Sequence, residues 1–179
     1  MEMAYYFVIL VRIILAPLIL VWPTTAIILS LLLDIFDADF AYKVITKKQY
    51  QMVDKILDSF VLLFELILAW QVLPEFKLLL TILFVWRMIG LTVFLESKNR
   101  HVLLVFGNFF ENVFFLLYFA TTFKSLNFLL LNQAVFYTAM TLAFLSKIFH
   151  EWFIHVAELS IREHLFGSKR KWKNDKINL

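Results

Sequence analysis

The chain contains no cysteine, which excludes disulfide bonds, thiol catalysis and cysteine-based zinc sites. Glycine and proline are scarce, with three residues of each among 179, and this scarcity argues against long structureless loops. Charged residues make up only 17% of the chain and hydrophobic residues 62%, whereas a soluble domain is nearer half apolar. A soluble domain of this length would lack the polar surface needed to cover it. The composition therefore indicates an integral membrane protein.

Six segments are predicted to be membrane-spanning helices, each of which needs about 20 mostly apolar residues. They are approximately Ala4–Trp22, Thr24–Phe40, Met52–Val72, Phe76–Leu95, Val102–Phe123 and Asn127–Ile148. We expect the first to be a retained span, because it has neither the basic start nor the small-residue cleavage site of a signal peptide. The prediction is an all-α bundle of six transmembrane helices over residues 1–150. An amphipathic segment and a basic cytoplasmic tail follow over residues 151–179.

Lysine and arginine lie mostly on one side of these expected helices. Twelve fall between residues 43 and 55, between residues 98 and 100, or after residue 160, and only Lys77 and Lys124 fall on the other side. Basic residues mark the cytoplasmic side of a membrane protein. Both termini and the 43–50 connection are therefore predicted to be cytoplasmic. The net charge of +3 fits loops that face anionic lipid rather than nucleic-acid binding.

Four aspartates stand where the second and third expected helices meet the cytoplasmic interface. Asp34 and Asp37 are three residues apart, and Asp54 and Asp58 are four apart, so each pair shares a helix face. If the two helices are neighbours, the four carboxylates converge and repel one another. Divalent cations with oxygen ligands relieve this repulsion, and Mg²⁺ often completes its shell with water and substrate phosphate. The spacing therefore predicts a metal site for a phosphorylated substrate.

The alternative is that these aspartates are ordinary charges at helix ends. An aspartate can cap a helix, and Asp54 can pair with Lys55 or Lys47. This interpretation suits a single aspartate better than four at paired helical spacing. Asp39 fits neither face and is interpreted as an ordinary charge.

The segment from Asp34 to Asp58 resembles the signature of the CDP-alcohol phosphotransferase family, D-x2-D-G-x2-A-R-x8-G-x3-D-x3-D. "DIFDADFAY" matches its first half and "YQMVDKILD" its second, so the four aspartates fall on the four acids of the signature. The opening "VRIILAPLIL" and the six-span topology are similar to the family's as well. Ala38, Tyr42 and Tyr50 stand where the signature has Gly, Arg and Gly, and the stretch between the halves is one residue shorter.

The resemblance implies a membrane enzyme of phospholipid biosynthesis. Such an enzyme moves a phosphatidyl or substituted phosphate group from a CDP-linked donor to an alcohol acceptor and releases CMP. By the resemblance, Asp34, Asp37, Asp54 and Asp58 bind Mg²⁺ or Mn²⁺, and Asp58 is also the general base. The resemblance implies nucleotide-binding positions at Ala38, Ala41, Tyr42, Lys43 and Tyr50. The acceptor-binding candidates are Arg87, Lys98, Arg100 and Lys147. The implied partners are the donor, the acceptor, the bilayer and a second copy of the chain, with no nucleic acid.

Two other functions stay open at the level of the sequence. The first is a degenerate, non-catalytic membrane relative of the same fold that binds lipid or a partner protein. The position of Tyr50 separates it from the enzyme, because a phenol beside the carboxylates would exclude a nucleotide. The second is a small ion transporter, which would need polar residues across the membrane midplane rather than at one face. Among the remaining charges, we expect Lys147 to pair with Glu151 four residues on, and Glu111 to lie in a buried ion pair.

Overall fold

The computed structural model describes residues 2–99, 101–155 and 172, and it contains no β-strand over those ranges. The predicted all-α fold is thus confirmed. The chain divides into two compact units, the first ending at Leu68 and the second beginning at Ala69, and Trp172 belongs to the first.

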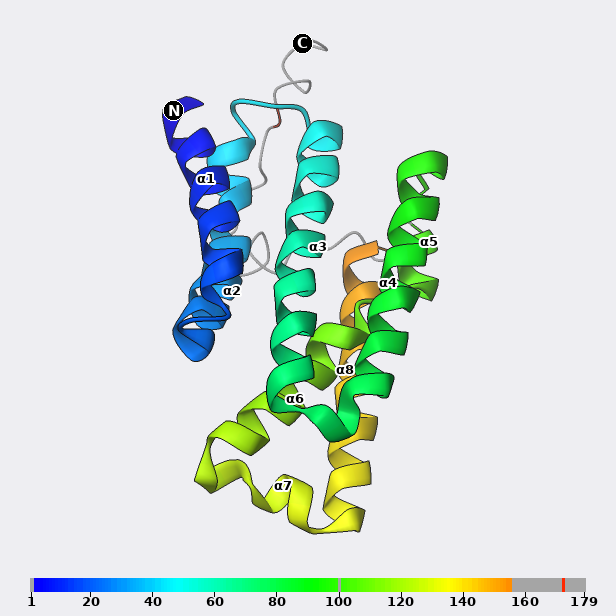
Figure 1. The fold of residues 1–179 in the computed structure, drawn as a ribbon. Helices are drawn as coiled ribbons and strands as arrows, with labels where there is room; N and C mark the ends of the chain where they lie inside the picture. Colours follow the sequence, from blue (N-terminus) through cyan, green and yellow to red (C-terminus); the bar gives the residue numbers. More distant parts are fainter. Residues whose placement is uncertain (1, 100, 156–171, 173–179) are drawn as a thin grey trace. The chain divides into compact units, whose positions relative to one another are not determined.

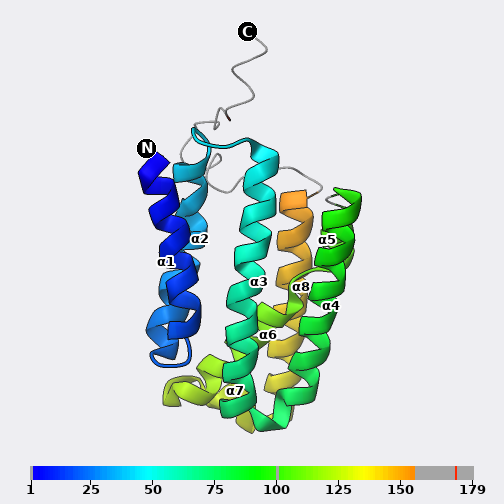
Figure 2. The same ribbon diagram turned by 45° about the horizontal axis from the view of Figure 1, so that its top comes forward.

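The first unit contains α1 (Glu2–Leu18), α2 (Pro23–Ala41) and most of α3 (Lys47–Val72). Helices α1 and α2 form an antiparallel hairpin, and α3 lies beside it (Figures 1 and 2). Pro23 occupies the first turn of α2, where a missing backbone N–H leaves no hydrogen bond unmade. This arrangement brings the C-terminal end of α2 close to the N-terminal end of α3.

Helix α3 begins with a reciprocal side-chain cap. The backbone N–H of Gln49 donates to Thr46 Oγ1 at 3.2 Å, and the backbone N–H of Thr46 donates to Gln49 Oε1 at 3.1 Å. This is a capping box, which satisfies two amide groups that the first turn of a helix leaves without partners. It fixes the start of α3 one turn before Tyr50.

The second unit is built from the helices that follow Leu68. They are α4 (Lys77–Ser97), α5 (Val102–Val105), α6 (Phe109–Thr122), α7 (Phe128–Leu131) and α8 (Gln133–His155), with 3₁₀ turns η1 (Pro74–Phe76) and η2 (Lys124–Leu126). Helix α6 packs against α4 and α8. Its side chains Phe110, Phe114 and Leu117 are fully buried and form the centre of this unit.

A close contact at Gly90 holds α4 against the segment after α5. A Cβ atom at residue 90 would lie 2.0 Å from Phe106 Cβ, so no larger residue fits without displacing the backbone. The ring of Phe106 also lies 4.6 Å, between ring centroids, from Trp86 one turn earlier in α4. The lack of a side chain at residue 90 therefore sets the distance between these two segments.

The number of membrane spans differs from the prediction. Pro74–Ser97 and Val102–Thr122 are long and apolar enough to cross a membrane, and Lys124–Leu131 with Gln133–Trp152 makes a third if the bent pair counts as one span. Six spans were predicted, whereas the structure supports two or three among the residues that it describes. Helix α1 is short, with 17 residues, and α2 carries three aspartates near its end. The most apolar 18-residue stretch of α3, residues 55–72, still contains Lys55, Asp58 and Glu65.

Two predicted continuous helices are also interrupted. The segment Val102–Phe123 breaks between α5 and α6, at Gly107 and Asn108. The segment Asn127–Ile148 bends by 102° between α7 and α8. At that bend the Asn132 side chain accepts hydrogen bonds from the backbone N–H groups of Ala134 and Val135, at 2.9 and 3.3 Å, and so caps α8. Helix α8 then continues to His155, past the boundary predicted at residue 150.

Candidate metal centre

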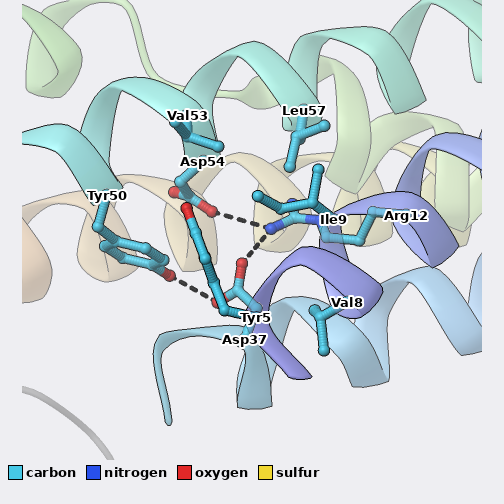
Figure 3. A pocket seen from close by; sticks show the side chains of 9 residues that line it. All are labelled: Tyr5, Val8, Ile9, Arg12, Asp37, Tyr50, Val53, Asp54 and Leu57. Atoms are coloured by element: carbon cyan, nitrogen blue, oxygen red, sulfur yellow. Dashed lines mark hydrogen bonds and ion pairs between the residues drawn. The ribbon is translucent and has the colours of Figure 1, made fainter. Parts of the chain in front are cut away.

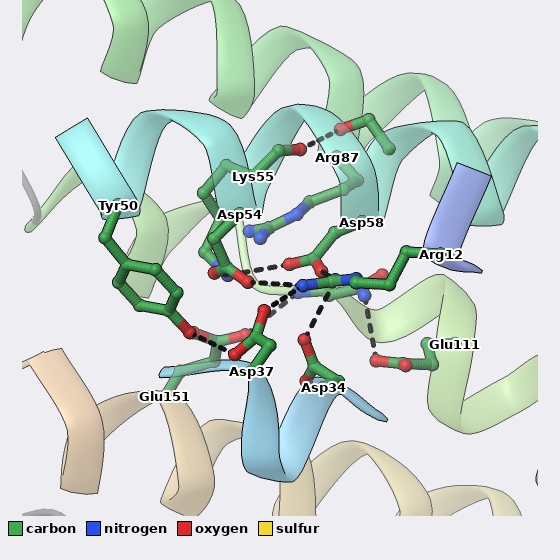
Figure 4. Close-up of polar contacts among 12 residues, drawn as sticks. Arg12, Asp34, Asp37, Tyr50, Asp54, Lys55, Asp58, Arg87, Glu111 and Glu151 are labelled. Atoms are coloured by element: carbon green, nitrogen blue, oxygen red, sulfur yellow. Dashed lines mark hydrogen bonds and ion pairs between the residues drawn. The ribbon is translucent and has the colours of Figure 1, made fainter. Parts of the chain in front are cut away.

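The four aspartates converge around the side chain of Arg12 (Figure 4). The Nη1 group of Arg12 donates to Asp37 and, at 3.2 Å, to Asp54; its Nη2 group donates to Asp34 at 3.1 Å and to Asp58 at 2.6 Å. Arg12 is buried, with 3% of its surface exposed. One guanidinium from α1 therefore joins the end of α2 to the start of α3.

Lys55 supplies a second positive charge to the same cluster. Its Nζ atom lies 2.8 Å from Asp54 Oδ2 and 2.7 Å from Asp58 Oδ2. The pairing of Asp54 with Lys55 that the sequence left open is therefore present. With all groups ionised, four negative and two positive charges leave the cluster with a formal charge of −2.

Three of the four aspartates have the geometry of a metal site. Asp34, Asp54 and Asp58 each offer one oxygen, and these oxygens all lie within 4.8 Å of one another. Oxygen ligands at about 2.0–2.6 Å from a shared ion are separated by distances of this order. The three residues therefore fit a divalent cation such as Mg²⁺ or Mn²⁺. Asp37 is not part of this group; Arg12 donates to one of its oxygens and Tyr50 to the other.

Tyr50 lies beside the aspartates. Its hydroxyl donates to Asp37 Oδ1 at 2.6 Å (Figure 3), and its ring lies 5.2 Å from that of Trp172. Burial, and then the negative charges of Asp54 and Asp37, raise the pKa of Tyr50 above its ordinary value. The phenol is therefore a neutral donor. The cavity that it lines with Arg12 and Asp37 measures about 10 Å³, roughly the space of one water molecule.

The other predicted nucleotide-binding positions lie at the end of α2. Ala38 and Ala41 are buried, at 5% and 0% exposure, and Ala41 packs with Tyr5 in the core of the first unit. Tyr42 is the C-terminal cap residue of α2, and the exposed Lys43 places its Nζ atom 5.2 Å from the centroid of the Tyr42 ring. In this structure both alanines are packed in the interior.

The predicted acceptor-binding residues belong to the second unit. Arg87 is buried and donates to the carbonyl oxygen of Phe106 at 3.0 Å. Lys147 lies 3.5 Å from Glu111 Oε2 and 3.6 Å from Glu151 Oε1, so both predicted ion pairs are present, although Glu111 is only partly buried. Arg87 and Lys147 are thus held by contacts within their own unit.

Lys98 and Arg100 lie after α4. Lys98 is exposed and adopts a left-handed conformation, with φ of 57°, as the residue that ends α4. Arg100 lies outside the described residues.

The role of Arg12 as the common partner of the aspartates was not predicted from the sequence. An arginine in the middle of an apolar helix needs a negative partner at the same depth, and this need was the available signal. Two further contacts were missed: Asn108 Nδ2 donates to Glu111 Oε2 at 2.9 Å, and the backbone N–H of Asn108 donates to Glu151 at 3.2 Å. The second contact ties the start of α6 to α8.

Comparisons of the chain with protein-family models, with curated proteins and with solved structures find no match. The likeness to CDP-alcohol phosphotransferases therefore rests on the residues themselves, chiefly those from Asp34 to Asp58. Over the part of the chain that the structure describes, fold and site together define an all-α protein with two or three candidate membrane spans and an acidic cluster gathered around a buried arginine.

Proposed function

We propose that the protein is a membrane phosphotransferase that requires Mg²⁺ or Mn²⁺. It would move a phosphatidyl or substituted phosphate group from a CDP-linked donor to an alcohol acceptor, with release of CMP. The observation that carries the proposal is the convergence of Asp34, Asp54 and Asp58, from two helices, into a geometry that fits a divalent cation. The spacing within each aspartate pair is that of the acids in the family signature, and the stretch between the pairs is one residue shorter.

The surface of the first unit supports a place in the bilayer for its helices too. Large apolar side chains are exposed along α1 and α2, among them Phe7, Leu10, Ile14, Ile28, Leu32 and Phe36. Exposed apolar surface of this extent marks contact with lipid or a partner, while Arg12 and Asp37 are buried. We therefore propose that α1, α2 and α3 also cross the membrane, with both termini and the aspartates on the cytoplasmic side.

The chemistry assigns separate roles to the aspartates. A bound divalent cation would neutralise charge on the donor's diphosphate and polarise phosphorus; Asp34, Asp54 and Asp58 are the residues that would hold it. Asp58 would accept the proton of the acceptor hydroxyl. At the same time the hydroxyl oxygen would bond to the transferred phosphorus, and the bond between that phosphorus and the CMP oxygen would break. Both oxygens of Asp58 are engaged by Arg12 and Lys55, so this role requires that those contacts open.

A second candidate is a non-catalytic membrane relative of the same fold that binds lipid or a partner protein. The position of Tyr50 favours it: the phenol is bonded to Asp37 and the adjoining cavity holds about 10 Å³. A CDP group needs far more room, since ligand pockets commonly measure about 300–1,000 Å³. Catalysis therefore requires Tyr50 to move aside.

The two candidates are separated by measuring CMP release. Purified protein in lipid nanodiscs is supplied with a CDP-linked lipid, a panel of alcohols, and Mg²⁺ or Mn²⁺. The enzyme proposal expects metal-dependent CMP release that Asp34→Asn abolishes, while Lys48→Gln, at an exposed position of α3, leaves it unchanged.

The variant Tyr50→Gly tests the obstruction directly. Faster CMP release than from the unaltered protein would show that the phenol obstructs a working site. If neither protein binds or cleaves a CDP-linked lipid or alcohol, the enzyme proposal is wrong and the non-catalytic relative replaces it.

A further inference from the structure

Seven of the eight aspartate oxygens in the cluster already accept a hydrogen bond. Arg12 engages one oxygen on each of the four carboxylates, Lys55 engages the second oxygen of Asp54 and of Asp58, and Tyr50 engages the second oxygen of Asp37. Metal ligation uses lone pairs of the same oxygens. Since both oxygens of Asp54 and both oxygens of Asp58 already have a cationic donor, a divalent cation at this site competes with Arg12 and Lys55 for these two carboxylates.

We infer that Arg12 is a resident counter-ion that exchanges with the divalent cation at this site. The inference rests on the metal site of the proposed function and adds a role for a residue of α1 to it. In the structure the guanidinium holds Asp34, Asp54 and Asp58 together. When the metal binds, these three carboxylates pass from Arg12 and Lys55 to the ion.

Asp37 is the aspartate to which Arg12 can stay bonded when the metal ion binds. It lies outside the group of three carboxylates that fits a metal, and the Tyr50 hydroxyl holds its other oxygen. Arg12 can therefore keep its contact with Asp37 while it releases the other three. Its released N–H groups would then lie near the ion and suit the oxygens of a bound phosphate, for which guanidinium groups are strong donors.

The net charge of the cluster matches the binding of one divalent cation. Its formal charge of −2 equals the charge that one divalent cation neutralises. Because Arg12 and the ion are both positive and use the same carboxylates, each weakens the binding of the other. Removing Arg12 should therefore tighten metal binding even though it takes away contacts that shape the site.

The experiment measures Mn²⁺ binding to the full chain in nanodiscs at constant ionic strength, from the paramagnetic resonance signal of unbound Mn²⁺. Arg12→Gln is expected to lower the Mn²⁺ dissociation constant about 5- to 150-fold, the usual range for coupling between two sites. Lys48→Gln is the matched control, since it removes the same charge from an exposed position of α3, and it should bind like the unaltered protein. Mn²⁺ should also raise the unfolding temperature of Arg12→Gln by more than that of the unaltered protein.

Each outcome decides a different point. Weaker or unchanged binding in a folded Arg12→Gln protein overturns the exchange but leaves the proposed function standing. Binding only after Arg12 is removed supports the exchange and overturns the metal-dependent enzyme. No binding in either protein overturns both.

A folding defect is covered by a second variant. If Arg12→Gln does not fold, Arg12→Lys keeps the charge but cannot reach four carboxylates with one ammonium group. The exchange then predicts a Mn²⁺ dissociation constant between those expected for the unaltered protein and for Arg12→Gln. A constant no lower than that of the unaltered protein overturns it.

Discussion

Asp58 differs from the other aspartates in the role that it would have in catalysis. Asp58→Asn keeps the size of the side chain and one oxygen but removes the base. Turnover should fall by about 10²- to 10⁴-fold, the usual contribution of general-base catalysis, and added Mg²⁺ or Mn²⁺ should not restore it. The measurement is the initial rate of CMP release over a series of metal concentrations.

Asp34→Asn is the matched comparison for Asp58→Asn. It removes a ligand carboxylate and no base, so its lost turnover should return in part at high metal concentration. Circular dichroism checks that both variants keep their helices. Equal recovery of the two variants with metal would assign Asp58 to metal binding alone.

The raised pKa of Tyr50 predicts that the folded protein loses stability at alkaline pH. Burial and the charges of Asp54 and Asp37 raise the pKa of this phenol in the folded protein, whereas in the unfolded chain it is about 10. The hydrogen bond to Asp37 therefore stabilises the fold fully below pH 10 or so, and this contribution is lost as the pH rises above that value. Tyr50→Phe should be less stable than the unaltered protein at neutral pH, by about 1.5–3 kcal/mol.

The measurement is the unfolding free energy of both proteins between about pH 7 and pH 11, around the ordinary tyrosine pKa. The difference between them should be constant at first and then shrink. Tyr137→Phe, at an exposed tyrosine, corrects for general alkaline effects. A difference that grows with pH would contradict a raised pKa for Tyr50.

Only part of the site could be predicted from the sequence at this scale. The pairing of Asp34 with Asp37 and of Asp54 with Asp58 follows from helix geometry, and the structure brings the four together. Arg12 lies 22 to 46 residues from its partners, so no local spacing identifies it. The hydroxyl contact of Tyr50 depends on the rotation of α3 relative to α2, which the sequence does not specify.

At the scale of the helices, Gly90 gives the sharpest prediction. Gly90→Ala places a methyl group 2.0 Å from Phe106 Cβ, so α4 and the segment after α5 must separate. The loss should reach or exceed the upper end of the roughly 1–3 kcal/mol usual for overpacking. Thermal unfolding in detergent measures it.

Gly107→Ala provides the comparison for Gly90→Ala. There the nearest atoms, in the flexible side chain of Glu151 and the ring of Phe109, lie 3.3 Å from the added Cβ atom. The cost should therefore be clearly smaller. Equal destabilisation by the two substitutions would contradict the close approach at Phe106.

Hydropathy located the helices better than it located their ends. Long apolar runs predicted α4 and α8, whereas the break at Asn132 depends on one side chain that caps two amide groups. The capping box of Thr46 and Gln49 follows a readable T-x-x-Q pattern. A hydropathy profile averages over such polar residues and does not detect them.

For the molecule as a whole, the proposed orientation is tested by labelling. The chain has no native cysteine, so a cysteine introduced at Lys48 is the only thiol. It should react with an impermeant reagent from the cytoplasmic side alone, because basic residues collect on that side. Lys77→Cys, at the exposed start of α4, should react from the opposite side. Labelling of residue 48 from the outside only would invert or exclude the proposed topology.

The contacts of Arg12 also bear on how the chain enters the bilayer during synthesis. A lone charge costs about 2.5–3.5 kcal/mol at the centre of an inserting helix and less toward a helix end, where Asp37 and Asp54 stand. Helix α1 carries Arg12, while Asp37 on α2 and Asp54 on α3 are its buried partners. Each helix therefore enters lipid more readily once the charges are paired. We expect α1, α2 and α3 to wait at the insertion machinery and to partition into the membrane as one assembled group.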